Sequence, residues 1–156
     1  MDLKPDHPKT AVDAPVLLIL TILLTIALQK LLPLPFPLAT LPSRILGAIL
    51  FLGGFALGFP ALRGMLKAKT SPNPHQPTNA LVFDATYRIT RNPMYLGMLI
   101  NYSGLSIFFQ NLWFAPLLLV LIWLFTTLVI IPEEEYLEGK FGKEYLDFKT
   151  HIRRWI

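Results

Sequence analysis

The sequence contains no cysteine and few charged residues. None of its 156 residues is cysteine, and only 15% are Asp, Glu, Lys or Arg. The absence of cysteine excludes disulfides, thiolate metal sites and a cysteine nucleophile. The low charge content, together with 53% hydrophobic residues, argues against an ordinary soluble domain with a single core. The chain is therefore predicted to be a small integral membrane protein.

Metal-ligand patterns and nucleic-acid-binding patterns are also missing. His7 and His75 lie in proline-rich segments with no second ligand at metal-binding spacing, so no metal site is predicted. The formal net charge is +4, but the basic residues lie beside apolar segments and form no run of their own. Membrane lipids with anionic headgroups are the expected counter-surface, and no nucleic acid partner is expected.

Four apolar stretches approach the roughly 20 residues that a helix needs to cross a bilayer. They cover about residues 15–32, 43–66, 93–109 and 112–131. The first is predicted to be retained, because it is longer than the apolar part of a signal peptide and no small-residue cleavage site follows it. The expected fold is all-α, with four transmembrane helices in a single domain of residues 1–156.

The distribution of Lys and Arg predicts the orientation. With four spans, the N-terminus, a loop of residues 67–92 and a tail of residues 132–156 share one side of the membrane. All but two of the 14 Lys and Arg residues fall on that side, the exceptions being Lys30 and Arg44. Since cytoplasmic segments carry the excess of basic residues, both termini and the 67–92 loop are predicted to face the cytoplasm.

The connections between the spans predict two helical hairpins. The first two spans are joined by the proline-rich "LPLPFPLATLP" and the last two by the short "QNLW", and neither segment continues a helix. Gly54 and Gly58 in the second span match a small-residue motif for close helix packing. The 67–92 loop is longer than most loops in compact proteins, which favours a functional role.

The tail is predicted to form a cytoplasmic amphipathic helix. Its apolar residues recur at steps of three or four, the spacing of one helix face; they are Leu137, Phe141, Tyr145, Phe148 and Ile152. Pro132 and the three glutamates after it favour a helix start there, because proline fits a first turn and carboxylates favour its positive end. Glycines at 139 and 142 predict a bend.

Polar residues gather at two ends of the apolar stretches. "YRITRNPMYLG" (87–97) leads into the third span and "EEE" (133–135) follows the fourth. Taken singly, the arginines are explained as membrane anchors and the glutamates as helix caps. A hairpin of spans three and four brings Arg91 and Glu133 to the same face, which predicts a site for a polar ligand group beside an apolar one. Pro93 leaves nearby backbone N–H groups free for a carboxylate or phosphate.

At these residues the sequence resembles the isoprenylcysteine carboxyl methyltransferase and phospholipid methyltransferase group of membrane enzymes. The resemblance covers roughly Lys69 to Trp155, in "LVFDATYRITRNPMYLG" and "EEEYLEGKFGKEYLDFKTHIRRW". Three ordered blocks carry it: Arg91, Asn92, Pro93, Tyr95 and Gly97; Glu133, Glu134 and Leu137; and Phe141, Gly142 and Tyr145. Asn92 stands where the prenylcysteine enzymes usually have histidine, and Ala85 where a glycine is common.

The resemblance implies methyl transfer from S-adenosylmethionine, with the cofactor in a cytoplasm-facing pocket and a lipid-like or small hydrophobic acceptor entering from the bilayer. The residues implied at the cofactor are Tyr87, Arg91, Asn92, Pro93, Tyr95, Glu133 and Glu134. The expected catalytic residues are Arg91, Glu134 and Arg153.

Four functions remain open at this point. The leading one is carboxyl methylation of a prenylcysteine-like acceptor, because a carboxylate is already ionised near neutral pH and needs an arginine such as Arg91, Arg153 or Arg154 to position it. N-methylation of a phospholipid or S-methylation of a thiol would need a base, for which Glu133, Glu134 and His151 are candidates. The fourth is a non-catalytic membrane subunit.

Overall fold

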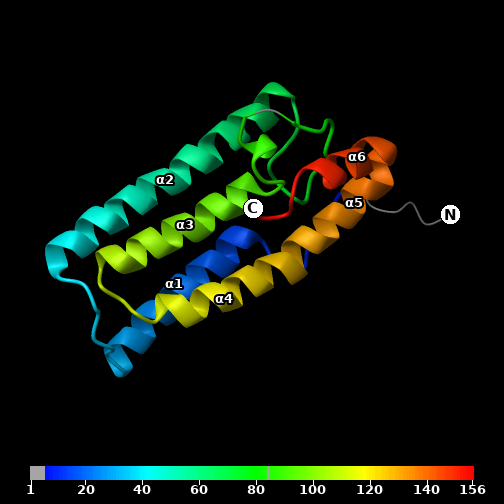
Figure 1. The fold of residues 1–156 in the computed structure, drawn as a ribbon. Helices are drawn as coiled ribbons and strands as arrows, with labels where there is room; N and C mark the ends of the chain where they lie inside the picture. The colour runs from blue at the N-terminus through cyan, green and yellow to red at the C-terminus, as the bar shows by residue number, and fades with distance from the viewer. Residues whose placement is uncertain (1–5, 84) are drawn as a thin grey trace.

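The computed structural model of the protein describes residues 6–83 and 85–156, and in this part of the chain every regular element is a helix (Figure 1). The elements are α1 (Ala14–Leu31), α2 (Thr40–Lys67), the 3-10 helix η1 (Ala85–Arg88), α3 (Pro93–Phe108), α4 (Phe114–Leu124), the π-helical segment η2 (Phe125–Ile130), α5 (Ile131–Phe141) and α6 (Lys143–His151). The all-α prediction is confirmed for these residues.

Three of the described helices are long and apolar enough to cross a membrane. They are Ala14–Leu31, Thr40–Lys67 and the continuous helix Phe114–Phe141. The protein is therefore an integral membrane protein. Helix α3, expected as a further span, has 16 residues, which corresponds to about 24 Å at about 1.5 Å per residue. It is shorter than the roughly 30 Å hydrocarbon core, so the count of four spans stays a prediction.

Helices α2 and α3 approach each other through glycines. A Cβ atom added to Gly47 would lie 2.5 Å from the backbone nitrogen of Phe108 and 2.6 Å from the Gly104 carbonyl oxygen. One added to Gly97 would lie 2.6 Å from the Gly54 carbonyl oxygen. Small residues permit such close packing of membrane helices. Of the predicted motif, Gly54 lies in the interface, and the Gly58 backbone nitrogen would lie 3.3 Å from a Cβ atom on Gly97. A Cβ atom on Gly58 itself would meet nothing within 4 Å.

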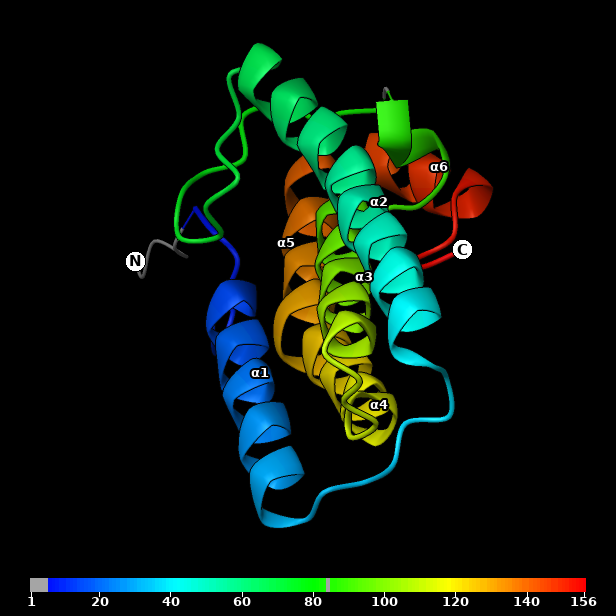
Figure 2. The ribbon, with the colours of Figure 1, turned by 90° about the vertical axis from the view of Figure 1, so that its left-hand side faces the viewer.

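The predicted hairpin of α1 with α2 is wrong. Helix α1 packs against α4 and α3, and it lies on the opposite side of these helices from α2 (Figure 2). The proline-containing segment 32–39 joins the two helices, and eight extended residues reach about 26 Å at about 3.3 Å each. The connection is therefore long enough for α2 to pack on the glycine face of α3. The second predicted hairpin, α3 with α4, is present.

Polar side chains join α1 to the rest of the bundle. The Thr25 hydroxyl and the Tyr102 hydroxyl share a hydrogen bond of 2.7 Å, and the Asn111 side-chain amide donates to the Thr25 carbonyl oxygen at 3.0 Å. Tyr102 is fully buried. Because lipid offers no competing hydrogen-bond partners, these contacts give α1 a defined position against α3.

Replacing Tyr102 with phenylalanine is expected to destabilise the bundle by about 0.6 kcal/mol, and by no more than about 1.7 kcal/mol, the range measured for hydrogen bonds between membrane helices. Unfolding in mixed micelles measures this loss. Ser103→Ala is the control, because within the described residues the Ser103 hydroxyl donates only to the Leu99 carbonyl oxygen of its own helix. Equal stability of the two variants would contradict a role of Tyr102 in holding α1.

The fourth span does not end at residue 131, and the predicted helix start at Pro132 is wrong. The helix runs without interruption from Phe114 to Phe141. Segment η2 ends at Ile130, two residues before the proline. Proline lacks a backbone N–H, and its ring clashes with the carbonyl four residues earlier, so a wider π-helical turn accommodates it. Glu133 and Glu134 are thus held on a rigid continuation of the span.

The predicted bend in the tail occurs at Gly142. This residue has a φ of 54° and separates α5 from α6, a conformation that glycine adopts without steric cost. Gly139 lies within α5. The apolar stripe expected on one amphipathic helix is consequently divided between two short helices, and α6 turns back toward the start of α3 (Figure 1).

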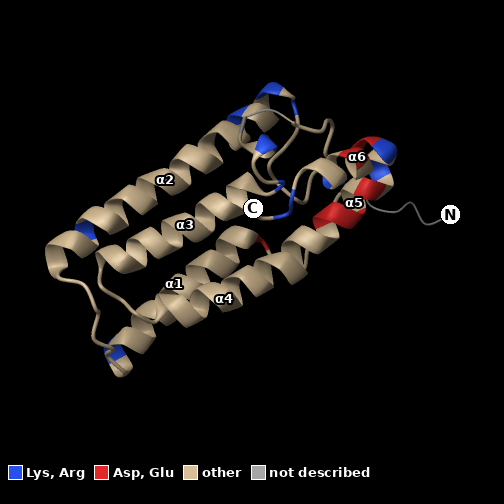
Figure 3. Ribbon diagram, in the orientation of Figure 1, with Lys and Arg blue, Asp and Glu red and all other residues tan. Residues whose placement is uncertain are grey.

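Basic residues gather at one end of the molecule (Figure 3). This end carries the α2–α3 loop, α5, α6 and both ends of the described chain. Lys30 in the last turn of α1 and Arg44 near the start of α2 lie at the other end. Lys4, which was counted with the basic end, lies outside the described residues.

Candidate active site

A cavity of about 120 Å³ lies at the basic end of the bundle, between the α2–α3 loop, the start of α3 and the start of α5. All seven residues expected at the cofactor line it: Tyr87, Arg91, Asn92, Pro93, Tyr95, Glu133 and Glu134. They come together because α3 and α4 are antiparallel, so that the first turn of α3 and the continuation of α4 into α5 reach the same end. Met65, Met94 and Leu137 add apolar wall.

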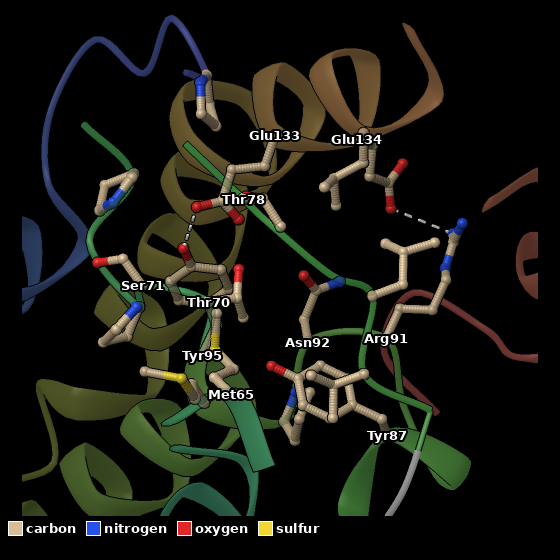
Figure 4. Close-up of a pocket in the computed structure, with 18 of the residues that line it drawn as sticks. Met65, Thr70, Ser71, Thr78, Tyr87, Arg91, Asn92, Tyr95, Glu133 and Glu134 are labelled. Atoms are coloured by element: carbon tan, nitrogen blue, oxygen red, sulfur yellow. Dashed lines mark hydrogen bonds and ion pairs between the residues drawn. The ribbon is translucent and has the colours of Figure 1, made fainter. Parts of the chain in front are cut away.

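An ion cluster forms one wall of the cavity (Figure 4). Glu134, only 5% exposed, forms ion pairs with two arginines. Arg154 binds it in a bidentate manner, with Nε at 3.1 Å from Oε1 and Nη2 at 2.7 Å from Oε2. Arg91 Nη2 lies 3.2 Å from Oε1. Sequence reasoning expected Arg91 to face Glu133, whereas the structure pairs it with Glu134.

Arg91 keeps two donors unused. Its Nε and Nη1 atoms are buried and have no hydrogen-bond partner among the described residues. A buried N–H group without a partner costs about 1–3 kcal/mol, so an acceptor that enters the cavity is favoured at this position. A planar guanidinium offers its donors in a fork that matches a carboxylate or phosphate.

Two tyrosines and Glu133 form the other wall. The Tyr95 hydroxyl donates to Glu133 Oε1 at 2.6 Å, and the two side chains point toward each other across this side of the cavity (Figure 4). No ion pair joins Glu133 to a cation within residues 6–83 and 85–156. Burial, with a smaller contribution from Glu133, raises the pKa of Tyr87 well above its ordinary value, so this phenol stays protonated.

The C-terminal residues 152–156 complete the back of the site. The Arg91 backbone N–H donates to the Arg153 carbonyl oxygen at 3.0 Å. The Thr90 hydroxyl and the Asn92 side-chain amide both donate to the Arg154 carbonyl oxygen, each at 2.9 Å. The amide of Asn92, which stands where histidine was expected, therefore holds the tail.

The structure does not bring the Arg153 side chain into the cavity. That side chain is exposed, while the adjacent Arg154 pairs with Glu134. Ile152 has extended backbone angles, φ −118° and ψ 130°, and successive side chains of an extended segment point in opposite directions. The sequence did not indicate a role for Thr90. It also did not show which of Arg153 and Arg154 contacts the site, because the amphipathic pattern predicted a helix through Ile152.

The outer wall is the loop of residues 70–82, which touches the N-terminal segment. His75 Nε2 lies 2.8 Å from Asp13 Oδ1, and the Thr78 backbone N–H donates to the Tyr136 hydroxyl at 3.2 Å. The Asn79 backbone N–H donates to the Thr70 hydroxyl at 2.9 Å. A search of the described residues finds no group of three or more His, Cys, Asp or Glu that could hold a metal ion.

Comparison with known proteins relates the chain to membrane methyltransferases. Residues 42–144 match the family described as phospholipid methyltransferase. Protein-S-isoprenylcysteine O-methyltransferase B of Arabidopsis thaliana is 33% identical over 72 residues, which are 46% of this chain and 36% of the plant protein. The chain thus aligns with about a third of that relative's length.

A second relative is an uncharacterized protein of Haemophilus influenzae (strain ATCC 51907 / DSM 11121 / KW20 / Rd). It is 34% identical over 65 residues, which are 40% of this chain and 100% of that protein. No solved structure matches the chain.

Proposed function

Because the chain belongs to the phospholipid methyltransferase family, we propose that it transfers a methyl group from S-adenosylmethionine to a lipid-like or small hydrophobic acceptor. The observation that carries the proposal is Arg91, an arginine with two buried donor atoms that have no partner among the described residues, at a cavity beside apolar helices. Such a combination suits a ligand with an anionic group, and the helices around it suit an acceptor dissolved in the bilayer.

The residues at the cavity fit the cofactor. The Nε and Nη1 atoms of Arg91 would hold its carboxylate, and the Asn92 side chain and Tyr87 add polar contacts. The Tyr95 ring and the Glu133 carboxylate are suited to a positively charged group. When bound, S-adenosylmethionine supplies an electrophilic methyl group on a sulfonium, which a nucleophile accepts by in-line displacement.

The loop of residues 70–82 must move outward for the whole cofactor to enter. The cavity has about 120 Å³, whereas sites for small molecules and cofactors usually enclose about 300–1,000 Å³. One contact that fixes the loop is the exposed pair of His75 with Asp13, and an exposed ion pair contributes only about 0–1 kcal/mol. Opening the loop therefore costs little at this contact.

We propose a carboxylate as the leading acceptor, and the name of the plant relative, an O-methyltransferase of protein S-isoprenylcysteine, supports methylation at oxygen. A carboxylate with a pKa near about 3.5 is already a nucleophile at neutral pH. The protein then has to align the reacting groups and exclude water, tasks that need an arginine and an apolar wall and no base. Of the two arginines in the ion cluster, Arg91 lines the cavity and is the cation for this task.

An amine acceptor, as on a phospholipid, is the second candidate, and Glu133 favours it. An amine must lose a proton, and Glu133 has no cation partner in the described chain and lies at the cavity beside Tyr95. A carboxylate held in this way is a suitable proton acceptor. A thiol acceptor would also have to lose a proton to a base.

We also propose that the cavity faces the cytoplasm. The end that contains it carries most of the basic residues (Figure 3), and basic residues favour the cytoplasmic side of a membrane. Labelling of single cysteines introduced near residues 75 and 150 tests this orientation, because the chain has no cysteine of its own. Labelling from the outside of intact cells would contradict it.

Methyl transfer by the purified protein tests the proposed activity. Radiolabelled S-adenosylmethionine is offered with a prenylcysteine, a phosphatidylethanolamine or a hydrophobic thiol, side by side in detergent. We expect label in the prenylcysteine product, released by mild base because the product is an ester. Base-stable label on the amine or the thiol would favour that acceptor instead. No transfer to any acceptor, with the cofactor bound, would favour a non-catalytic membrane subunit.

A further inference from the structure

We infer that Arg154 is a positioning residue of the proposed cofactor site, an assignment that rests on the proposed function. Arg154 lies beyond residues 42–144, where the family matches, and it does not line the cavity. Its side chain binds Glu134 and its backbone carbonyl binds the Asn92 side chain, and both of these residues line the cavity. Its effect on a ligand therefore passes through Glu134, Arg91 and Asn92.

The side chain of Arg154 fixes Glu134. Two hydrogen bonds, from Nε at 3.1 Å and Nη2 at 2.7 Å, occupy both carboxylate oxygens of this buried residue. Arg91 reaches only Oε1, at 3.2 Å. Because Arg154 occupies both oxygens of Glu134, the Nε and Nη1 atoms of Arg91 form no hydrogen bond with this carboxylate. These two donors therefore stay available for a ligand.

The carbonyl oxygen of Arg154 fixes the segment that contains Arg91. It accepts from the Thr90 hydroxyl and from the Asn92 amide, each at 2.9 Å. Both residues are buried, so a lost acceptor is not easily replaced by water. The residue between them, Arg91, is held by the neighbouring carbonyl of Arg153 at 3.0 Å. Trp155 packs against the core of the bundle and secures the tail beyond these bonds.

The side-chain contact of this arrangement requires an arginine, whereas any residue at position 154 has the backbone carbonyl. A guanidinium offers two parallel donors to a carboxylate, whereas a lysine ammonium acts as a point charge and does not reproduce the fork. Loss of the ion pair frees the tail, and the tail then no longer presents its carbonyl groups to Thr90 and Asn92. The position of Arg91 in the cavity thus depends on a residue 63 positions later.

The test uses the chain of residues 1–156 in detergent with four variants: Arg154→Ala, Arg154→Lys, Glu134→Gln and the double variant Arg154→Ala/Glu134→Gln. Arg153→Ala is the matched control, since the Arg153 side chain is exposed and only its backbone carbonyl takes part. Calorimetry measures the Kd for S-adenosylmethionine. Hydrogen exchange of the peptide spanning residues 86–97, measured without cofactor, reports whether the segment is held.

Arg154→Ala is expected to raise the Kd about tenfold, equivalent to about 1.4 kcal/mol, and to speed exchange in the 86–97 peptide. Arg153→Ala is expected to change neither. In the Glu134→Gln background, Arg154→Ala is expected to add little, because residues that act through one contact are not additive. Arg154→Lys is expected to fall between wild type and alanine.

Wild-type values for Arg154→Ala in both measurements would overturn the assignment, as would independent, fully multiplicative effects in the double variant. If Arg154→Ala does not fold, Arg154→Lys is the deciding variant. A Kd and an exchange rate equal to those of wild type in Arg154→Lys would overturn the assignment. If the wild-type protein binds no S-adenosylmethionine, the proposed function fails, while the exchange measurement without cofactor still decides whether Arg154 positions residues 90–92.

Discussion

Replacement of Arg91 by alanine is expected to lower the rate of methyl transfer at least about 100-fold, or about 2.7 kcal/mol. The variant removes two buried donors that have no partner among the described residues, and each hydrogen bond from a charged donor contributes about 1.5–3 kcal/mol. The rate is measured with radiolabelled cofactor and the acceptor that the wild-type protein prefers.

Arg63→Ala is the control for this variant. Arg63 is an exposed arginine on α2, near the same end of the molecule, and it does not line the cavity. We expect its rate to stay close to that of wild type. A rate for Arg91→Ala within about threefold of wild type, less than about 0.7 kcal/mol, would contradict a role of Arg91 at the reacting groups. When the rate falls as expected, the Kd for the cofactor tells whether the lost contact was to the cofactor or to the acceptor.

The second large effect is expected where α2 meets α3. Gly47→Ala places a Cβ atom 2.5 Å from the Phe108 backbone nitrogen and 2.6 Å from the Gly104 carbonyl oxygen. Both obstacles are backbone atoms, so the helices have to move apart, at a cost of about 3 kcal/mol or more. Unfolding in mixed micelles measures the loss, and displacement of α3 is expected to lower cofactor affinity as well.

Gly53→Ala on the same helix is the matched control. A Cβ atom at this position meets nothing within 4 Å, and alanine favours a helix over glycine by about 1 kcal/mol. The control is therefore expected to be neutral or slightly stabilised. If both variants have the same stability, the close contact of α2 with α3 does not determine the stability of the fold.

Local sequence patterns predicted much of the fold, and the resemblance to a known family implied the residues that line the cavity. Apolar runs identified the long helices, because bilayer thickness fixes their length. The "RNP" and "EEE" segments were placed together because a short connection makes α3 and α4 antiparallel. These patterns involve residues that are close in the sequence, so they can be interpreted without knowledge of the tertiary packing.

Features that depend on packing between distant segments were not predictable in the same way. Pro132 indicates a helix start in most contexts, and only the preceding π-helical segment makes it an interior residue. The choice of Glu134 over Glu133 as partner of Arg91 follows from the rotation of α5, which that π-helical segment alters. The roles of Arg153 and Arg154 depend on where the tail becomes extended, and no short-range pattern marks that point.

Binding of S-adenosylmethionine to the purified wild-type protein, measured by calorimetry in detergent, tests the central claim most directly. We predict saturable binding with one site per chain, and weaker binding in Arg91→Ala than in Arg63→Ala. Absence of saturable binding to the folded wild-type protein, or equal affinity in the two variants, would contradict the proposal that the Arg91 cavity is the cofactor site.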